Sequence, residues 1–123
     1  MPGETRVAVN GYGVIGKRVA DAVALQDDME LVGVADVGSD YRVRVAAERG
    51  YPIFAAAGDR RDEMEAAGIS VVGSLDDLLG ASEVVVDCTP KRVAAANRNR
   101  YEYAGVKGCL PRGRVARPCR LLA

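Results

Sequence analysis

A run of closely spaced glycines near the N-terminus is the first feature of this sequence that could do chemistry. Residues 11–16 fit the pattern G-x-G-x-x-G, and the residues that we predict to contact a cofactor here are Gly11, Tyr12, Gly13, Val14, Ile15 and Gly16. In such a turn the first glycine permits a tight bend, the second lets the backbone approach a pyrophosphate, and the third lets a helix pack on a strand. The amides that begin this helix would then face the phosphates with the positive end of the helix dipole.

An acidic residue stands twenty positions beyond the last of these glycines, at Asp36. At the end of a strand, a carboxylate would accept hydrogen bonds from both hydroxyls of an adenosine ribose. It would also repel a 2′-phosphate, so we expect NAD to be preferred over NADP, which remains possible. The alternative is that the glycines only form a tight turn and that Asp36 is a solvated residue at the end of a strand.

Two further candidate residues, Thr89 and Pro90, follow the apolar run EVVVDC. Ligands of open α/β sheets lie outside the carboxyl ends of the strands, so Thr89 could contact the nicotinamide ribose or the pyrophosphate. Alternatively, Thr89 caps the next helix and Pro90 occupies its first position. We interpret Cys88 as a small buried residue, because the chain contains no histidine that could activate a thiol.

Alternating strands and helices would position these residues. The periodicity predicts strands at 6–10, 31–35, within 51–57, at 69–72 and at 83–88, and the start of another at 106–107. It predicts helices at 15–25, 41–49, 59–67 and 91–104, with Gly50, Gly68 and Gly105 as C-terminal caps, and a short helix capped by Ser74. This order is typical of βαβ units and predicts an α/β fold, a doubly wound parallel sheet with helices on both faces.

Composition excludes several classes of protein. The chain has 123 residues, enough for one compact domain, and is 49% hydrophobic and 28% charged, which is typical of a globular protein. The seventeen basic and seventeen acidic residues give a net charge of zero. No excess of positive charge therefore indicates binding to nucleic acid or to an anionic membrane.

The absence of histidine and of any C-x-x-C pair excludes histidine-based triads and predicts no metal site. No signal-peptide segment is evident, and we expect a soluble, cytoplasmic protein.

The C-terminal segment differs in composition from the rest. Residues 108–123 (GCLPRGRVARPCRLLA) hold four basic residues and no acidic ones, so residues 1–107 hold thirteen basic against seventeen acidic side chains, a net charge of −4. We therefore predict a cofactor-binding domain over 1–107, followed by a basic tail over 108–123.

A longer stretch is similar to one known family. RVAVNGYGVIGKRVADAVALQDDMEL at 6–31 closely resembles the N-terminus of the archaeal-type (type II) phosphorylating glyceraldehyde-3-phosphate dehydrogenases. VGVAD, RGYPIFAA, AAGISVVGSLDDLL, VVVDCTP and YEYAGVK follow that family in order through residue 107. The resemblance implies that residues 1–107 are an incomplete Rossmann domain that binds NAD(P). In the family, a catalytic domain beyond the matched stretch supplies the cysteine that oxidises glyceraldehyde 3-phosphate to 1,3-bisphosphoglycerate, and the enzyme is a homotetramer. We therefore expect this chain alone to be inactive and not to bind that substrate.

The chain departs from the family pattern at three places. Val14 stands where most members have threonine, and Asp36 begins a loop that in the family is usually led by a lysine and favours NADP. After Lys107 the family continues with a strand resembling AVFQGGE, whereas this chain reads GCLPRGR. Codons for GCLPRGR can be chosen so that the reading frame shifted by one base encodes AVFQGGE. We therefore hypothesise a frameshift at Gly108. A genuine basic tail that binds nucleic acid or a partner is the alternative.

Two other functions remain open at this point. One is a freestanding dinucleotide-binding sensor, and the other is a different Rossmann enzyme such as a semialdehyde dehydrogenase, although QDDMEL and YEYAGVK argue against the latter.

Overall fold

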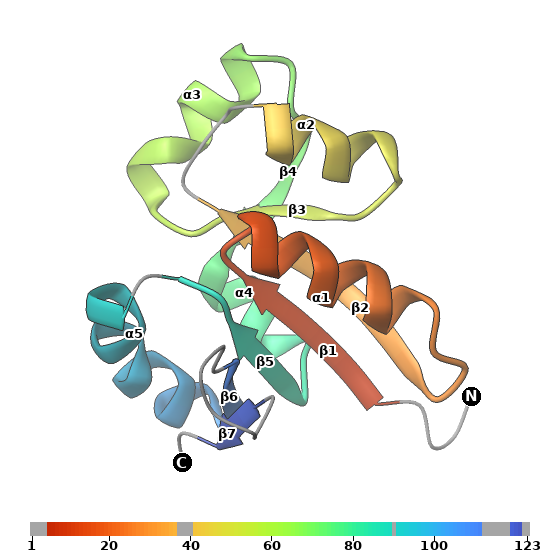
Figure 1. Ribbon diagram of the computed structural model, residues 1–123. Coiled ribbons are helices and arrows are strands. Elements are labelled where there is room, and N and C mark those ends of the chain that lie inside the picture. The colour runs from red at the N-terminus through yellow and green to blue at the C-terminus, as the bar shows by residue number, and fades with distance from the viewer. Residues whose placement is uncertain (1–4, 37–40, 90, 112–118, 122–123) are drawn as a thin grey trace.

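A mostly parallel β-sheet organises the protein. The computed structural model describes residues 5–36, 41–89, 91–111 and 119–121, and the order of the strands within this part is β4-β3-β2-β1-β5-β6-β7 (Figure 1). The strands are β1 (Thr5–Asn10), β2 (Met29–Asp36), β3 (Ile53–Ala55), β4 (Val71–Ser74), β5 (Val84–Asp87), β6 (Lys107–Pro111) and β7 (Cys119–Leu121). Neighbours from β4 through β6 pair in parallel, and β7 pairs antiparallel to β6.

Helices connect the parallel strands, as the alternating sequence pattern predicts. They are α1 (Val14–Ala24), α2 (Tyr41–Glu48), α3 (Arg61–Ala66), α4 (Leu75–Gly80) and α5 (Lys91–Ala104), with a 3-10 turn, η1 (Gly58–Arg60), before α3. Within the described part of the chain, no helix combines the length and apolar character that crossing a bilayer requires.

The strand order reverses at β1. The chain adds β2, β3 and β4 on one side of β1 and then crosses over to place β5 and β6 on the other side. The predicted doubly wound sheet is therefore confirmed. Open sheets of this kind bind their ligands outside the carboxyl ends of the two strands at the reversal, which here are β1 and β5.

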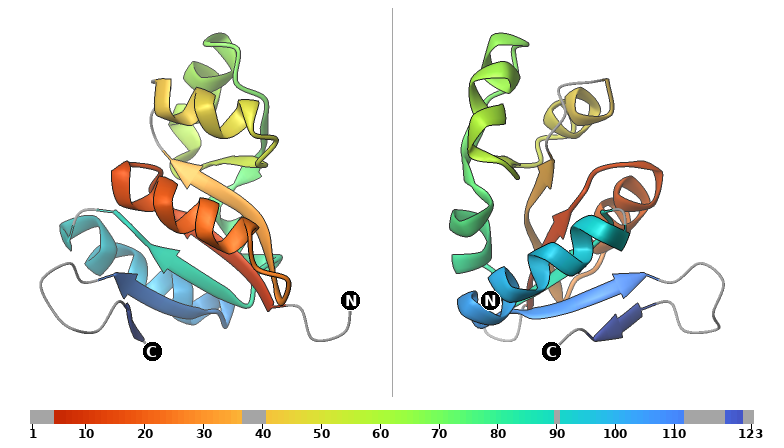
Figure 2. Two further views of the ribbon diagram at one scale, coloured as in Figure 1. Left: turned by 45° about the vertical axis from the view of Figure 1, so that its right-hand side comes forward. Right: turned by 90° about the vertical axis from the view of Figure 1, so that its left-hand side faces the viewer.

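Two apolar cores cover opposite faces of the sheet. Alternating strand residues point to opposite sides, so Val9 and Val34 belong to one core and their neighbours Ala8 and Ala35 to the other. The first core receives buried side chains from α1, α2 and α3, and the second receives them from α4 and α5. Figure 2 shows α1 and α4 on opposite sides of the sheet. This burial on both faces explains why the strands read as nearly continuous apolar runs.

Local signals set where the helices begin and end. Ser74 caps α4 as predicted: its hydroxyl accepts a hydrogen bond from the Asp77 amide (3.2 Å), and the Asp77 carboxylate accepts one from the Ser74 amide (3.0 Å). Gly50, Gly68 and Gly105 follow α2, α3 and α5 with φ of 83°, 90° and 74°. A residue with a side chain is strained at these angles, so glycine ends each helix there.

Some element boundaries differ from the prediction. The strand expected at 69–72 lies at Val71–Ser74, because the Ile69 amide donates to the Met64 carbonyl (3.0 Å) and completes the end of α3 before the chain enters the sheet. The strand that begins at Lys107 continues to Pro111, past the predicted domain boundary, and pairs with β5. Strand pairing uses main-chain groups, so it neither requires nor excludes a change of reading frame at Gly108.

The second core yields a direct test of the fold. Leu78 in α4 is completely buried, whereas Val72 on the edge strand β4 is 61% exposed. We expect Leu78→Ala to lower the free energy of unfolding by about 2–5 kcal/mol, since it removes buried methyl groups and leaves a cavity. Val72→Ala should change it by less than about 0.5 kcal/mol. Urea unfolding followed by circular dichroism measures both, and equal losses would contradict the burial of α4.

Candidate functional site

The ends of three strands meet where the sheet reverses direction. Asn10, the last residue of β1, lies in register with Ala35 of β2 and with Asp87 of β5. Two main-chain hydrogen bonds extend this alignment into the loops: Gly11 donates to the Ala35 carbonyl (2.7 Å), and Cys88 donates to the Asn10 carbonyl (2.8 Å). The glycine turn, the end of β2 and the end of β5 therefore form one edge, which brings the predicted residues Gly11, Asp36 and Thr89 together.

Two of the three glycines of the turn are required by close contacts within the chain, and the third borders open space. Gly11 has φ of +95°, and a Cβ there would lie 3.0 Å from the main chain of Cys88 and Thr89. A Cβ on Gly16 would lie only 1.9 Å from the Gly11 carbonyl oxygen, so α1 can approach β1 this closely only without a side chain. A Cβ on Gly13 would meet nothing within 4 Å. The tight bend and the close helix packing are thus present, and the backbone at Gly13 borders open space.

The first turn of α1 faces this space without a side-chain cap. Gly13 is the N-cap residue and has no side chain to accept from the helix amides, and the first turn contains no acidic residue. Val14 and Ile15 follow and are 59% and 52% exposed. The positive end of the helix dipole is therefore accessible, which is the arrangement that favours an anion.

Tyr12 contributes to this edge through its backbone. Its side chain is 1% exposed and packs in the core beneath α1 and α2, so its ring is not available to a ligand at the strand edge. Burial raises the pKa of its phenol, and the nearby Asp21 charge acts in the same direction. The Tyr12 amide donates to Oδ2 of Asp36 (2.6 Å), which ties the glycine turn to the end of β2. Asp36 is thus placed beside the turn, as its position in the sequence predicts.

A buried polar network lies beneath the end of β5, and the sequence analysis did not anticipate it. Asp87 is 1% exposed and accepts hydrogen bonds from the Thr89 amide (2.9 Å), from the Thr89 hydroxyl and from the Tyr101 hydroxyl. Asn10 Nδ2 donates to the Tyr101 oxygen (2.9 Å). Burial and the bond to Asp87 both raise the pKa of Tyr101, which therefore keeps its proton. The sequence contains one sign of this network: β1 and β5 each end in a polar residue, Asn10 and Asp87, after a buried apolar run.

Cys88 does not have the properties of a nucleophile. Burial raises the pKa of its thiol to about 12, and the Asp87 charge adds to this effect. A thiol with so high a pKa is almost entirely protonated at neutral pH, and only the thiolate attacks. Of the remaining predicted residues, Thr89 is half-buried beside the turn, and Pro90 lies outside the described residues.

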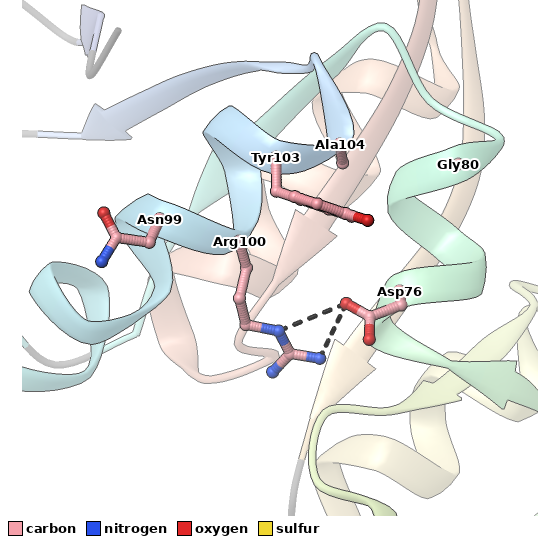
Figure 3. Close-up of a pocket in the computed structure, with 6 residues that line it drawn as sticks. All are labelled: Asp76, Gly80, Asn99, Arg100, Tyr103 and Ala104. Atoms are coloured by element: carbon pink, nitrogen blue, oxygen red, sulfur yellow. Dashed lines mark hydrogen bonds and ion pairs between the residues drawn. The ribbon is translucent and has the colours of Figure 1, made fainter.

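A hollow lies between α4 and α5, away from this edge. It has a volume of about 480 Å³ and is lined by Asp76, Gly80, Asn99, Arg100, Tyr103 and Ala104 (Figure 3). The Arg100 guanidinium donates twice to Oδ1 of Asp76, at 3.0 and 3.3 Å, so the two charges compensate each other. Tyr103 is 95% exposed. None of the predicted site residues lines this hollow.

Comparison with known proteins agrees with this geometry. Residues 5–107 match the family described as dihydrodipicolinate reductase, N-terminus. The chain belongs to this family. It is also 49% identical to a glyceraldehyde-3-phosphate dehydrogenase from Methanococcoides burtonii over 104 residues, which are 85% of this chain and 31% of that protein. The corresponding enzyme from Methanococcus maripaludis is 50% identical over 111 residues, 89% of this chain and 33% of that protein.

These relatives confirm the resemblance to archaeal glyceraldehyde-3-phosphate dehydrogenases and do not favour the alternative functions. The chain spans about a third of the length of the curated relatives that it matches. Among solved structures, an NAD-binding protein from Listeria innocua superimposes with a TM-score of 0.63 at 17% identity, over 87% of this chain and 27% of that one. At this identity the likeness establishes the fold, which is a Rossmann fold.

The glycine turn supports a paired stability test. We expect Gly16→Ala to lower the free energy of unfolding by about 1–3 kcal/mol, because its Cβ would overlap the Gly11 carbonyl and force α1 away from β1. Gly13→Ala should cost less than about 1 kcal/mol, since its Cβ enters open space. Thermal unfolding of both variants decides the matter, and equal costs would mean that α1 does not pack on the turn as described.

Proposed function

We propose that this chain binds a nicotinamide dinucleotide and is the cofactor-binding part of a glyceraldehyde-3-phosphate dehydrogenase. The observation that carries the proposal is the convergence of an uncapped helix N-terminus, an open backbone at Gly13 and the Asp36 carboxylate at one strand edge. The dehydrogenase relatives match the chain over this same stretch.

The pyrophosphate would lie against the start of α1. The space above Gly13 lets phosphate oxygens approach the main chain, and the amides of Val14 and Ile15 would donate to them. Because Val14 replaces the threonine common in the family, these contacts would come from the backbone and not from a hydroxyl. The bound cofactor would supply hydride acceptance at its nicotinamide ring, and the chain's own residues bind and orient it.

The adenosine ribose would lie at the end of β2. Asp36 is held beside the turn by the Tyr12 amide, at the place where a carboxylate accepts from ribose hydroxyls. Its negative charge opposes a 2′-phosphate, which supports a preference for NAD over NADP.

The chemistry on the aldehyde would belong to a part of the enzyme outside residues 5–107. Cys88, with its raised pKa and partly buried thiol, is unsuited to attack an aldehyde. We therefore propose that the chain alone neither binds nor oxidises glyceraldehyde 3-phosphate.

Three further features belong to the same proposal. They are the cytoplasmic location and the homotetramer implied by the family, and the frameshift at Gly108. Sequencing the DNA across codon 108 tests the frameshift, and a stop codon followed by an unrelated gene would contradict it.

Binding of NADH to the purified chain tests the central proposal. We expect the fluorescence of NADH to change on titration, and Gly13→Ala to weaken its binding by about tenfold, because the Cβ would occupy space that the phosphates need. Gly80→Ala is the matched control, since a Cβ there also meets nothing within 4 Å but lies in α4. Absence of binding by the unaltered chain would refute the proposal, as would equal effects of the two substitutions.

The preference between cofactors tests the role of Asp36. Asp36→Lys should shift the ratio of NADPH to NADH affinity by about tenfold or more toward NADPH, because repulsion becomes an ion pair. Asp36→Asn keeps an oxygen that can accept from the Tyr12 amide but removes the charge, so it should shift the ratio less. An unchanged ratio in both variants would show that Asp36 does not face the ribose.

A further inference from the structure

Both hydrogen-bond donors of Thr89 are engaged within the protein. Its amide donates to Oδ1 of Asp87 at 2.9 Å, and its hydroxyl donates to the same oxygen. Threonine has no other donor, and its hydroxyl oxygen retains a lone pair that can accept. Towards a ligand, therefore, the Thr89 side chain can only be an acceptor.

The surrounding network holds Asp87 in this orientation. The other carboxylate oxygen, Oδ2, accepts from the Tyr101 hydroxyl, and Asn10 donates to the same hydroxyl at 2.9 Å. These contacts join β1, β5 and α5, and Asp87 and Tyr101 are each only 1% exposed. Turning the carboxylate away would leave the Thr89 amide, the Thr89 hydroxyl and the Tyr101 hydroxyl without the acceptor that the structure gives them. The donors of Thr89 are therefore not available to a ligand.

Because Thr89 can only accept a hydrogen bond from a ligand, it suits one of the two groups that it could contact, the pyrophosphate and the nicotinamide ribose. Phosphate oxygens are acceptors and need a donor, whereas a ribose hydroxyl can donate to an acceptor. A Cβ on Gly11 would lie 3.0 Å from the Thr89 nitrogen, so Thr89 stands directly beside the glycine turn. The group that follows the pyrophosphate along the cofactor is the nicotinamide ribose.

We infer that Thr89 accepts a hydrogen bond from a hydroxyl of the nicotinamide ribose and makes no hydrogen bond to the pyrophosphate. This inference rests on the proposed function and deepens it. Asp87, Tyr101 and Asn10 act as positioning residues, because they set the direction of the Thr89 hydroxyl without touching the ligand. The pyrophosphate is then left to the amides at the start of α1.

Two ligands that differ by one ribose test the inference. ADP ends at the diphosphate, and ADP-ribose adds the second ribose without the nicotinamide ring. Isothermal titration calorimetry of the 123-residue chain should show tighter binding of ADP-ribose than of ADP. Thr89→Val, which removes the hydroxyl but keeps the shape and the amide, should weaken ADP-ribose binding about 3- to 10-fold and leave ADP binding within about twofold. Thr89→Ser keeps the hydroxyl and should bind both ligands as the unaltered chain does.

The comparison separates the possible failures. Equal weakening of both ligands in Thr89→Val would overturn the inference and assign the contact to the pyrophosphate. Unchanged affinity for ADP-ribose in that variant would also overturn it, as would equal affinities of the unaltered chain for the two ligands. Binding of neither ligand by the unaltered chain would refute the proposed function itself. Circular dichroism of Thr89→Val and of the unaltered chain is the control for folding, so a change in ADP affinity reports on binding alone.

Discussion

The close approach of α1 to the end of β1 is the constraint on which the rest of the site depends. It is possible only because Gly16 has no side chain where a Cβ would lie 1.9 Å from the Gly11 carbonyl oxygen. The approach places the first turn of α1 over the strand edge and aims its free amides at the space beside Gly13. It also buries the Tyr12 ring, which brings the Tyr12 amide within 2.6 Å of Asp36.

The second organising feature is a buried carboxylate held by neutral donors. A buried charge is costly unless hydrogen bonds compensate it, and Asp87 receives an amide and two hydroxyls. Within the described residues no lysine or arginine forms an ion pair with Asp87. The ion pairs present there involve exposed or partly exposed side chains, where solvent weakens them. Asn10 and Asp87, two of the three polar residues that are buried in the described part of the chain, lie at the strand edge where the cofactor would bind.

In the proposed mode of binding, the two features would contact different parts of the cofactor. On the β2 side, the glycine turn and Asp36 present helix amides and a carboxylate, which suit a pyrophosphate and an adenosine ribose. On the β5 side, Asp87 takes up the donors of Thr89 and leaves an acceptor. The strand reversal at β1 puts both sides within reach of one elongated ligand. The similarity to the dehydrogenase relatives covers both sides, since it extends over 104 residues or more.

Local patterns in the sequence determined the alternating elements, the glycine turn and the Ser74 cap. Each depends on residues near one another in the chain, so periodicity and turn chemistry suffice to predict them. The sequence could not show that Tyr12 acts through its amide while its ring is buried, or that Asn10 and Tyr101, 91 residues apart, share a hydrogen bond. Those arrangements arise only when the sheet brings β1, β5 and α5 together, because the direction of a hydrogen bond depends on which groups burial leaves within reach of each other.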